Sequence, residues 1–206
     1  MIKAIIFDLS GVCSYEEEIP HLIEFAKKKN LDEEDVLQAY NELVLEAERD
    51  KISGIKIWEE LEERFSIKIN IEKEINEMIL KKKFYVDMLE FARSFRQRYK
   101  VATYSNYNKV YWNLITKKID LSQYFDIILV SYMVRARKTE KAGFEFLIKK
   151  LGVKPKEIVF LDDSEKNLKS AGELGINTIL FKNKKQLIQE LKKLGVDVSE
   201  EKDEVG

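Results

Sequence analysis

The first residues of the chain form an apolar run that constrains the fold more than any other feature of the sequence. Five of the six residues from Ile2 to Phe7 are apolar, and the run ends at a carboxylate, Asp8. A continuous apolar run is typical of a parallel strand that helices cover on both faces. Gly11 allows a sharp turn soon after it. We therefore expect Asp8 at the carboxyl end of a buried central strand, where open α/β sheets bind their ligands.

A long helical segment follows. After Val12 the apolar residues recur at helical spacing for roughly seventy residues. Asp32 and Ser53 are suited to cap two of the helices. Four amphipathic helices are predicted, near residues 20–30, 32–47, 53–65 and 71–83. With no convincing strand among them, they predict a small bundle inserted as a cap over residues 14–84, with Tyr40 and Trp58 in its own core.

From about residue 85 the pattern alternates between helices and strands. Helices are predicted near 86–95, 110–115, 139–151, 164–175 and 184–194, with Thr139 capping the third; strands are predicted near 100–105, 125–130, 158–161 and 176–181. This alternation predicts βαβ units and a parallel sheet. We therefore predict an α/β fold, a Rossmann-like doubly wound sheet, with a core of residues 1–13 and 85–196, the four-helix cap, and a flexible acidic tail at 197–206.

Charge and composition exclude several classes of function. The chain has 36 Lys and Arg against 37 Asp and Glu, so no broad cationic face for nucleic acid is expected. No apolar run approaches the ~18 residues of a transmembrane helix, and the first run is too short for a signal peptide. We expect a cytoplasmic protein that binds neither membrane nor nucleic acid. The single cysteine, Cys13, excludes an internal disulfide and is expected to be a half-buried filler, and the only histidine, His21, is expected on a helix surface.

Polar residues gather where the predicted strands end. Asp8, Ser105–Asn106 and Asp162–Asp163 stand at strand ends, and Lys138 lies in a loop before a helix. Because the carboxyl ends of parallel strands share one edge of the sheet, a candidate nucleophile, a hydroxyl, a cation and two further carboxylates should meet there. Three carboxylates at one place repel each other, and an all-oxygen ligand set selects Mg²⁺.

In these residues the sequence resembles the haloacid dehalogenase superfamily, from residue 2 to about residue 194. Phe7–Val12 looks like the first motif of that family, Ser105–Asn106 like the second, Lys138 like the third and Val159–Asn167 like the fourth. The helical insertion between the first two motifs is similar to the small helical cap of the family. The order of the motifs, with the cap in the right gap, predicts membership of the phosphatase branch.

The resemblance implies a Mg²⁺-dependent phosphatase that hydrolyses a small phosphorylated metabolite through an aspartyl-phosphate. It implies that Asp8 is the nucleophile and that Lys138 supplies a second positive charge. Ser105 and Asn106 would bind the phosphoryl group together with Lys138.

The same resemblance implies a metal site. Asp8, the backbone carbonyl of Ser10 and Asp163 would hold the ion. Asp162 would be either a further ligand or a residue behind the ligands. Asn167 would orient the groups that surround the site.

The sequence departs from the family at Ser10. Phosphatases of this family usually carry an Asp there, which protonates the leaving alcohol and then activates water. Losing such general acid–base catalysis typically costs about 10²–10⁴ in rate. Three outcomes stay open: a slower phosphatase in which Tyr15, a cap residue or water relays protons; a non-catalytic or very slow member that binds a phosphorylated ligand; and a 2-haloacid dehalogenase. The last of these does not use a metal, so the Asp162–Asp163 pair disfavours it.

Some properties are not determined by the sequence. These are the substrate, the cap residues that select it and the oligomeric state. Tyr107, Tyr111 and Trp112 are expected to be exposed, and whether they serve an interface or the core stays open.

Overall fold

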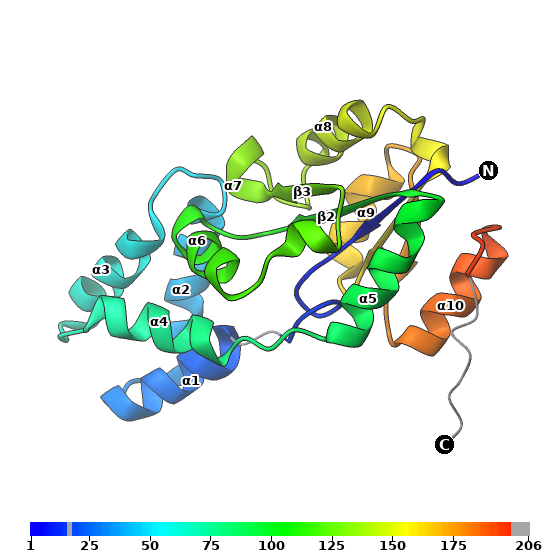
Figure 1. Ribbon diagram of the computed structural model, residues 1–206. Helices are drawn as coiled ribbons and strands as arrows, with labels where there is room; N and C mark the ends of the chain where they lie inside the picture. The colour runs from blue at the N-terminus through cyan, green and yellow to red at the C-terminus, as the bar shows by residue number, and fades with distance from the viewer. Residues whose placement is uncertain (16–17, 199–206) are drawn as a thin grey trace, which may run out of the picture.

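The centre of the protein is a five-stranded sheet in which all strands run parallel. The computed structural model describes residues 1–15 and 18–198. The strand order is β3-β2-β1-β4-β5 (Figure 1). The strands are β1 (Ala4–Phe7), β2 (Lys100–Ser105), β3 (Ile127–Val130), β4 (Ile158–Asp162) and β5 (Asn177–Leu180). The predicted α/β class and doubly wound sheet are confirmed, and β1 lies in the middle between β2 and β4.

Strand β1 is buried on both faces, as its apolar run predicts. Ile5 and Phe7 pack into one apolar cluster that includes residues of α5 (Val86–Ser94) and α10 (Lys184–Lys193). Ala4 and Ile6 pack into a second cluster on the other face, with residues of α8 (Lys141–Leu151) and α9 (Glu165–Gly172). All four side chains are fully buried. The carboxyl end of β1 is also where the strand order reverses, which is the ligand-binding position of doubly wound sheets.

The first four helices gather at one end of the molecule, on the left in Figure 1. They are α1 (Glu18–Lys29), α2 (Glu33–Ala47), α3 (Gly54–Phe65) and α4 (Ile71–Lys81). The predicted caps are confirmed, because Asp32 accepts from the N–H of Asp35 and Ser53 from that of Lys56. These helices pack on each other in sequence order, and α3 and α4 also pack on α6 (Lys109–Lys118). The assignment of residues 14–84 as a cap stays a proposal.

The interior of this helical group contains Trp58, which is fully buried and contacts Tyr40 and Phe25 edge-on. Tyr40 and Trp58 are thus core residues, as predicted. His21 is not on the surface: only 2% of it is exposed, and its Nε2 lies 3.2 Å from the Glu74 carboxylate. The apolar stripe of α1 faces the other helices, and His21 lies on that stripe.

The three aromatic residues of the 107–112 segment are buried, against expectation. Tyr107, Tyr111 and Trp112 are each 5% exposed or less. Tyr111 and Trp112 lie on α6, on which α3 and α4 pack, and the Tyr111 hydroxyl accepts from Trp58 Nε1 at 2.9 Å. Tyr107 precedes α6, and its backbone N–H donates to Ser131 Oγ at 3.1 Å. Of the two roles left open for these residues, the structure therefore supports the core and not a surface interface.

Smaller differences concern single residues and short elements. Helix α8 begins at Lys141 after Glu140, not at Thr139, because Glu140 accepts from the N–H of Arg137 and closes the preceding loop. Cys13 is fully buried rather than half-buried, and burial raises its thiol pKa. Short elements that were not predicted are α7 (Ser131–Val134), η1 (Phe95–Gln97), η2 (Leu121–Gln123) and η3 (Pro155–Glu157). Most of the predicted acidic tail, residues 199–206, lies outside the described residues.

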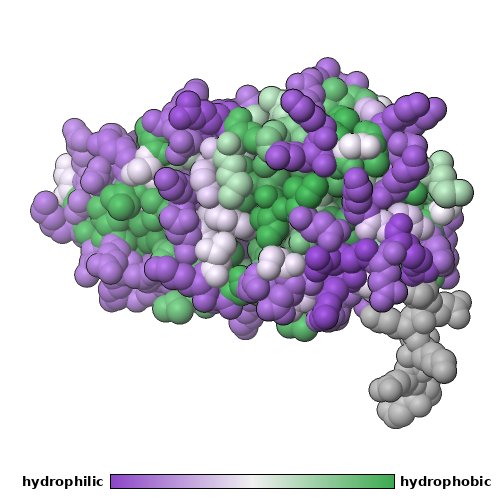
Figure 2. All heavy atoms as spheres, turned by 45° about the horizontal axis from the view of Figure 1, so that its top comes forward, coloured by the Kyte–Doolittle hydropathy of each residue, from purple (hydrophilic) through white to green (hydrophobic). Residues whose placement is uncertain are grey.

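The surface of the molecule is mainly hydrophilic, with separate hydrophobic patches over the helical end and over the middle of the face shown in Figure 2. In residues 1–15 and 18–198, no helix combines the length and the apolar character that crossing a membrane requires.

Candidate active site

A cavity of about 430 Å³ opens at the carboxyl edge of the sheet. Asp8 follows β1 directly, Asp163 follows β4, and Asn106 follows β2. Most of the predicted site residues line this cavity, namely Asp8, Ser10, Asn106, Lys138, Asp163 and Asn167. Ser105 and Asp162 are buried at the ends of β2 and β4 and do not line it. The fold therefore brings the predicted residues to one place from four separate segments.

Lys138 is a buried cation that lines the cavity. Its Nζ lies 2.6 Å from Asp8 Oδ2 and 2.7 Å from Asp162 Oδ2. Burial alone would lower the pKa of Lys138, but the two carboxylates outweigh it and the pKa is raised, so the ammonium stays charged. Burial raises the pKa of Asp8 well above its usual range; Lys138 opposes this rise, while Asp162 and Asp163 add to it. The lysine is thus the main group that favours the ionised form of Asp8.

Three carboxylates converge beside this lysine. Oxygen atoms of Asp8, Asp162 and Asp163 all lie within 4.8 Å of one another. Gly11 makes this approach possible, since a Cβ at Gly11 would lie 2.0 Å from Asp163 Oδ2, and its φ of +80° also suits glycine. A single lysine does not balance three carboxylates, so the cluster is suited to a hard divalent cation with oxygen ligands.

The two adjacent aspartates have different surroundings. Asp162 is fully buried, and its oxygens accept from Lys138 Nζ, the N–H of Ser164 and the Nδ2 of Asn167. Asp163 is exposed and lines the cavity. The contacts of Asp162 hold Lys138 and Asn167 in place, whereas Asp163 faces the space where a ligand would bind.

The end of β2 supplies two polar groups. The Ser105 hydroxyl is buried and has no hydrogen-bond partner among the described residues. A buried hydroxyl without a partner is unusual and suggests a partner that the protein itself does not provide. Asn106 accepts from the backbone N–H of Lys138 at 3.0 Å and so holds the loop that carries the lysine.

Ser10 contacts two residues that sequence reasoning missed. Its Oγ lies 2.5 Å from the Tyr107 hydroxyl and 3.4 Å from Lys82 Nζ, which also donates to the carbonyl of Tyr15. Lys82 is 7% exposed and lines the cavity, although its place in a lysine run indicated only the end of a helix. No sequence signal separates it from Lys81 and Lys83. Tyr15, a predicted proton relay, is 52% exposed and lines a different hollow.

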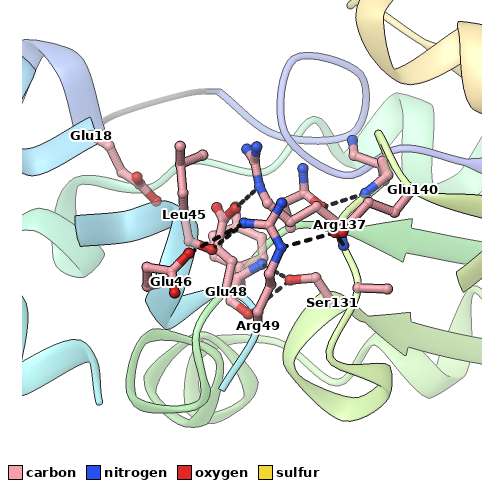
Figure 3. A network of polar contacts seen from close by, with 12 residues as sticks. Glu18, Leu45, Glu46, Glu48, Arg49, Ser131, Arg137 and Glu140 are labelled. Atoms are coloured by element: carbon pink, nitrogen blue, oxygen red, sulfur yellow. Dashed lines mark hydrogen bonds and ion pairs between the residues drawn. The ribbon is translucent and has the colours of Figure 1, made fainter. Parts of the chain in front are cut away.

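An ion-pair network connects the helical group to the loop before α8 (Figure 3). Glu48, which follows α2, pairs with Arg137. Arg49 pairs with Glu140 at 3.0 Å, and Glu140 also accepts from the N–H of Arg137 at 2.8 Å. Glu48, Arg137 and Glu18 of α1 line the cavity. The network therefore fixes the wall that lies opposite the sheet edge.

Replacing Lys138 with Met should lower the free energy of unfolding by about 3–5 kcal/mol, because it leaves two buried carboxylates without their cation. Urea unfolding in EDTA measures this effect. Lys141→Met is the matched control, since it removes an exposed pair with Glu173 at 3.0 Å and should cost less than about 1 kcal/mol. Equal, small effects of the two substitutions would contradict the buried pair.

Comparisons with known proteins identify the family of the chain. A family model described as haloacid dehalogenase-like hydrolase matches residues 2–175. The chain is 27% identical to D-ribitol-5-phosphate phosphatase of Bacteroides thetaiotaomicron, over 93% of this chain and 97% of that protein. A shorter match, 43% identical over 75 residues, covers 36% of this chain and 14% of bifunctional epoxide hydrolase 2 of Mus musculus. The chain spans 14% to 41% of the length of the first curated relatives that it matches.

A solved structure has a similar fold and a ligand in place. It is a HAD family enzyme of Bacteroides thetaiotaomicron, a mutant in complex with magnesium and inorganic phosphate. It matches with a TM-score of 0.77 and 25% identity, over 91% of this chain and 99% of that chain.

Proposed function

The chain belongs to the haloacid dehalogenase-like hydrolase family, and we propose that it is a Mg²⁺-dependent phosphatase acting on a small phosphorylated metabolite through an aspartyl-phosphate. The observation that carries the proposal is the position of Asp8, which is at the strand-order reversal, paired with Lys138 and facing the cavity. The full-length similarity to a sugar-alcohol phosphate phosphatase and the magnesium and phosphate of the structural neighbour support it.

In this mechanism Asp8 is the nucleophile. One carboxylate oxygen attacks phosphorus, and the bond between phosphorus and the leaving oxygen breaks as the new bond forms. Water then attacks the phosphorus of the aspartyl-phosphate, which releases inorganic phosphate and regenerates Asp8. Lys138 favours the ionised form of Asp8, which burial opposes, and places positive charge beside the phosphoryl oxygens. Ser105 would donate its hydroxyl to a phosphoryl oxygen, which supplies the partner that its buried oxygen lacks.

The donor set fits Mg²⁺. Asp8, Asp163 and the backbone carbonyl of Ser10 would hold the ion, whereas Asp162 would stand behind them because its oxygens already accept from Lys138, Ser164 and Asn167. When bound, the ion offsets the repulsion between a carboxylate nucleophile and a phosphate dianion.

One observation favours an alternative, a family member that binds a phosphorylated ligand with little or no turnover. At the position of the usual acid, Ser10 presents a hydroxyl bonded to Tyr107, and burial raises the pKa of that tyrosine well above its usual range. Neither hydroxyl is a good proton donor near neutral pH. The mechanism therefore works best when the leaving group needs no proton.

Removing the metal should abolish turnover of acetyl phosphate, which is small and has a good leaving group. Hydrolysis measured in EDTA and then with added Mg²⁺ tests this.

Asp163→Asn should raise the Mg²⁺ concentration needed for half-maximal thermal stabilisation by at least about tenfold. Glu165→Gln, an exposed carboxylate two residues away, should leave it unchanged. Full activity in EDTA would refute the metal requirement, and Mg²⁺ binding without any turnover would favour the alternative.

A further inference from the structure

Lys82 is a second buried lysine in the wall of the cavity. It follows α4 directly, is 7% exposed and lines the cavity. Its Nζ donates to the Tyr15 carbonyl at 3.1 Å and to Ser10 Oγ at 3.4 Å, and the same atom lies 5.4 Å from the centre of the Tyr107 ring. These three contacts fix the position of its ammonium group, whereas the lysines on either side of it are exposed.

The hydroxyl of Ser10 receives two hydrogen bonds. A serine hydroxyl has one proton to donate and two lone pairs that accept, whereas a lysine ammonium only donates, so Lys82 is the donor to Ser10 Oγ. The Tyr107 hydroxyl, 2.5 Å from the same oxygen, has no other hydrogen-bond partner among the described residues. Tyr107 is 3% exposed, and burial raises its pKa, so it keeps its proton. Because a buried proton without an acceptor is costly, Tyr107 donates to Ser10.

The proton of Ser10 itself is left for the cavity. Both lone pairs of its oxygen are occupied, and the side chain lines the cavity. Within residues 1–15 and 18–198, no group accepts this proton once Tyr107 is the donor. Hydrogen bonds in a chain polarise one another, so a hydroxyl that accepts from a cation donates more strongly. Ser10 therefore presents a strengthened donor to a bound ligand.

The leaving oxygen departs on the side from which Lys82 comes. In phosphoryl transfer the attacking and leaving oxygens lie roughly in line through phosphorus. Asp8 attacks from the sheet edge, so the leaving oxygen points to the opposite wall, which the helical group helps to form. Lys82 follows the last helix of that group, whereas Lys138 pairs with Asp8 on the attacking side. The two lysines thus place positive charge at opposite ends of the line of transfer.

We propose that the Ser10 hydroxyl donates a hydrogen bond to the leaving oxygen, and that Lys82 is the positioning residue that orients and strengthens this donor. Negative charge grows on the leaving oxygen as its bond to phosphorus breaks, and a fixed donor aimed at this charge lowers the barrier. Ser10 keeps its proton, and the departed oxygen takes one from water where it needs one. This inference rests on the proposed function and adds the residues that assist departure of the leaving group.

Lys82→Met tests the inference with two substrates that differ in leaving group, phenyl phosphate and acetyl phosphate. Phenolate is much more basic than a carboxylate, so its oxygen carries more charge that needs stabilisation. We expect kcat/KM to fall at least about tenfold for phenyl phosphate and less than about threefold for acetyl phosphate, as for the loss of part of an oxyanion-stabilising group. Lys83→Met, at the exposed neighbouring position, is the matched control and should change neither value. Equal losses for both substrates, the result of a purely structural role, would overturn the inference.

A double-mutant cycle tests whether Lys82 acts through Ser10. Ser10→Ala should lower kcat/KM for phenyl phosphate at least about tenfold. Adding Lys82→Met to it should cause no further loss, because residues that act as one unit are not additive. Losses that multiply would overturn the inference. If the Met variant does not fold, Lys82→Gln takes its place in both measurements, since it lacks the charge but can still donate to the Tyr15 carbonyl.

The inference and the proposed function are distinguished by the same measurements. Hydrolysis of acetyl phosphate by the natural protein, together with equal losses for both substrates in Lys82→Met, overturns the inference and keeps the phosphatase. If the natural protein hydrolyses neither substrate, the proposed function fails and the inference fails with it.

Discussion

Replacing Asp8 with Asn should lower kcat for acetyl phosphate by about 10⁴-fold or more, the loss typical of removing a nucleophile. An amide keeps the shape of the side chain but lacks the charge and the nucleophilic oxygen. Asp8 is 2% exposed and is paired with Lys138, so the substitution removes a buried, paired carboxylate and leaves the rest of the site in place. Initial rates at saturating Mg²⁺ measure the effect.

A control variant and a trapping experiment show whether the loss of activity comes from the missing nucleophile. Asp87→Asn, at an exposed position in the first turn of α5, should leave kcat unchanged. Rapid quenching with acid should trap a phosphorylated natural protein but no phosphorylated Asp8→Asn protein, since the acyl phosphate forms on the missing oxygen. Retention of most activity by the Asn variant would refute the covalent mechanism.

Replacing Ser10 with Asp should raise kcat for an alkyl phosphate by about 10², within the range that a positioned general acid contributes. Ser10 lines the cavity, so a carboxyl group at this position would lie in the space where the substrate binds. Acetyl phosphate should gain much less, because its leaving group needs no proton. The comparison of the two substrates in both proteins is the measurement.

Ser10→Asn is the control for this substitution. It adds a side chain of the same size as Asp but cannot act as an acid, so it should not accelerate either substrate. A gain in the Asn variant, or an equal gain for both substrates in the Asp variant, would show that the size of the side chain and not proton transfer is responsible.

Ser10 also makes a structural contact, which matters when the rates of its variants are compared. In the natural protein the Ser10 hydroxyl lies 2.5 Å from the hydroxyl of Tyr107, which is buried just before α6. This contact gives Ser10 a structural role, so that both Ser10 variants must be checked for thermal stability before their rates are compared.

Much of the fold could be predicted because its signals are local. The apolar run of β1 predicted a strand buried on both faces, since such runs are stable only between two helical layers. Asp32 and Ser53 predicted helix starts because their side chains bond to amides only three residues away. The positions of Asp8 and Asp162 at the sheet edge could be predicted for a similar reason, since the carboxyl ends of parallel strands meet at one edge whatever the details of packing.

The residues that were missed depend on packing between distant segments. Lys82 lies between two other lysines, and only the return of the chain from α4 places its ammonium beside Ser10. Tyr107 and His21 were expected to be exposed, because the sequence does not show which polar aromatic side chains are covered by the packing of other segments. The pairing of Glu48 with Arg137 joins residues far apart in the chain, and neither has a distinctive neighbour in the sequence.

By itself the sequence determined the order of strands and helices, the strand end that carries Asp8, and the set of polar residues that meet at the sheet edge. These follow from periodicity and topology, which are properties of short segments and of their order. Only the tertiary structure decided which of Asp162 and Asp163 faces the cavity, which lysine approaches Ser10, and which carboxylates form the opposite wall. Those outcomes depend on where side chains from separate segments come to lie, and the packing of the whole chain sets those positions.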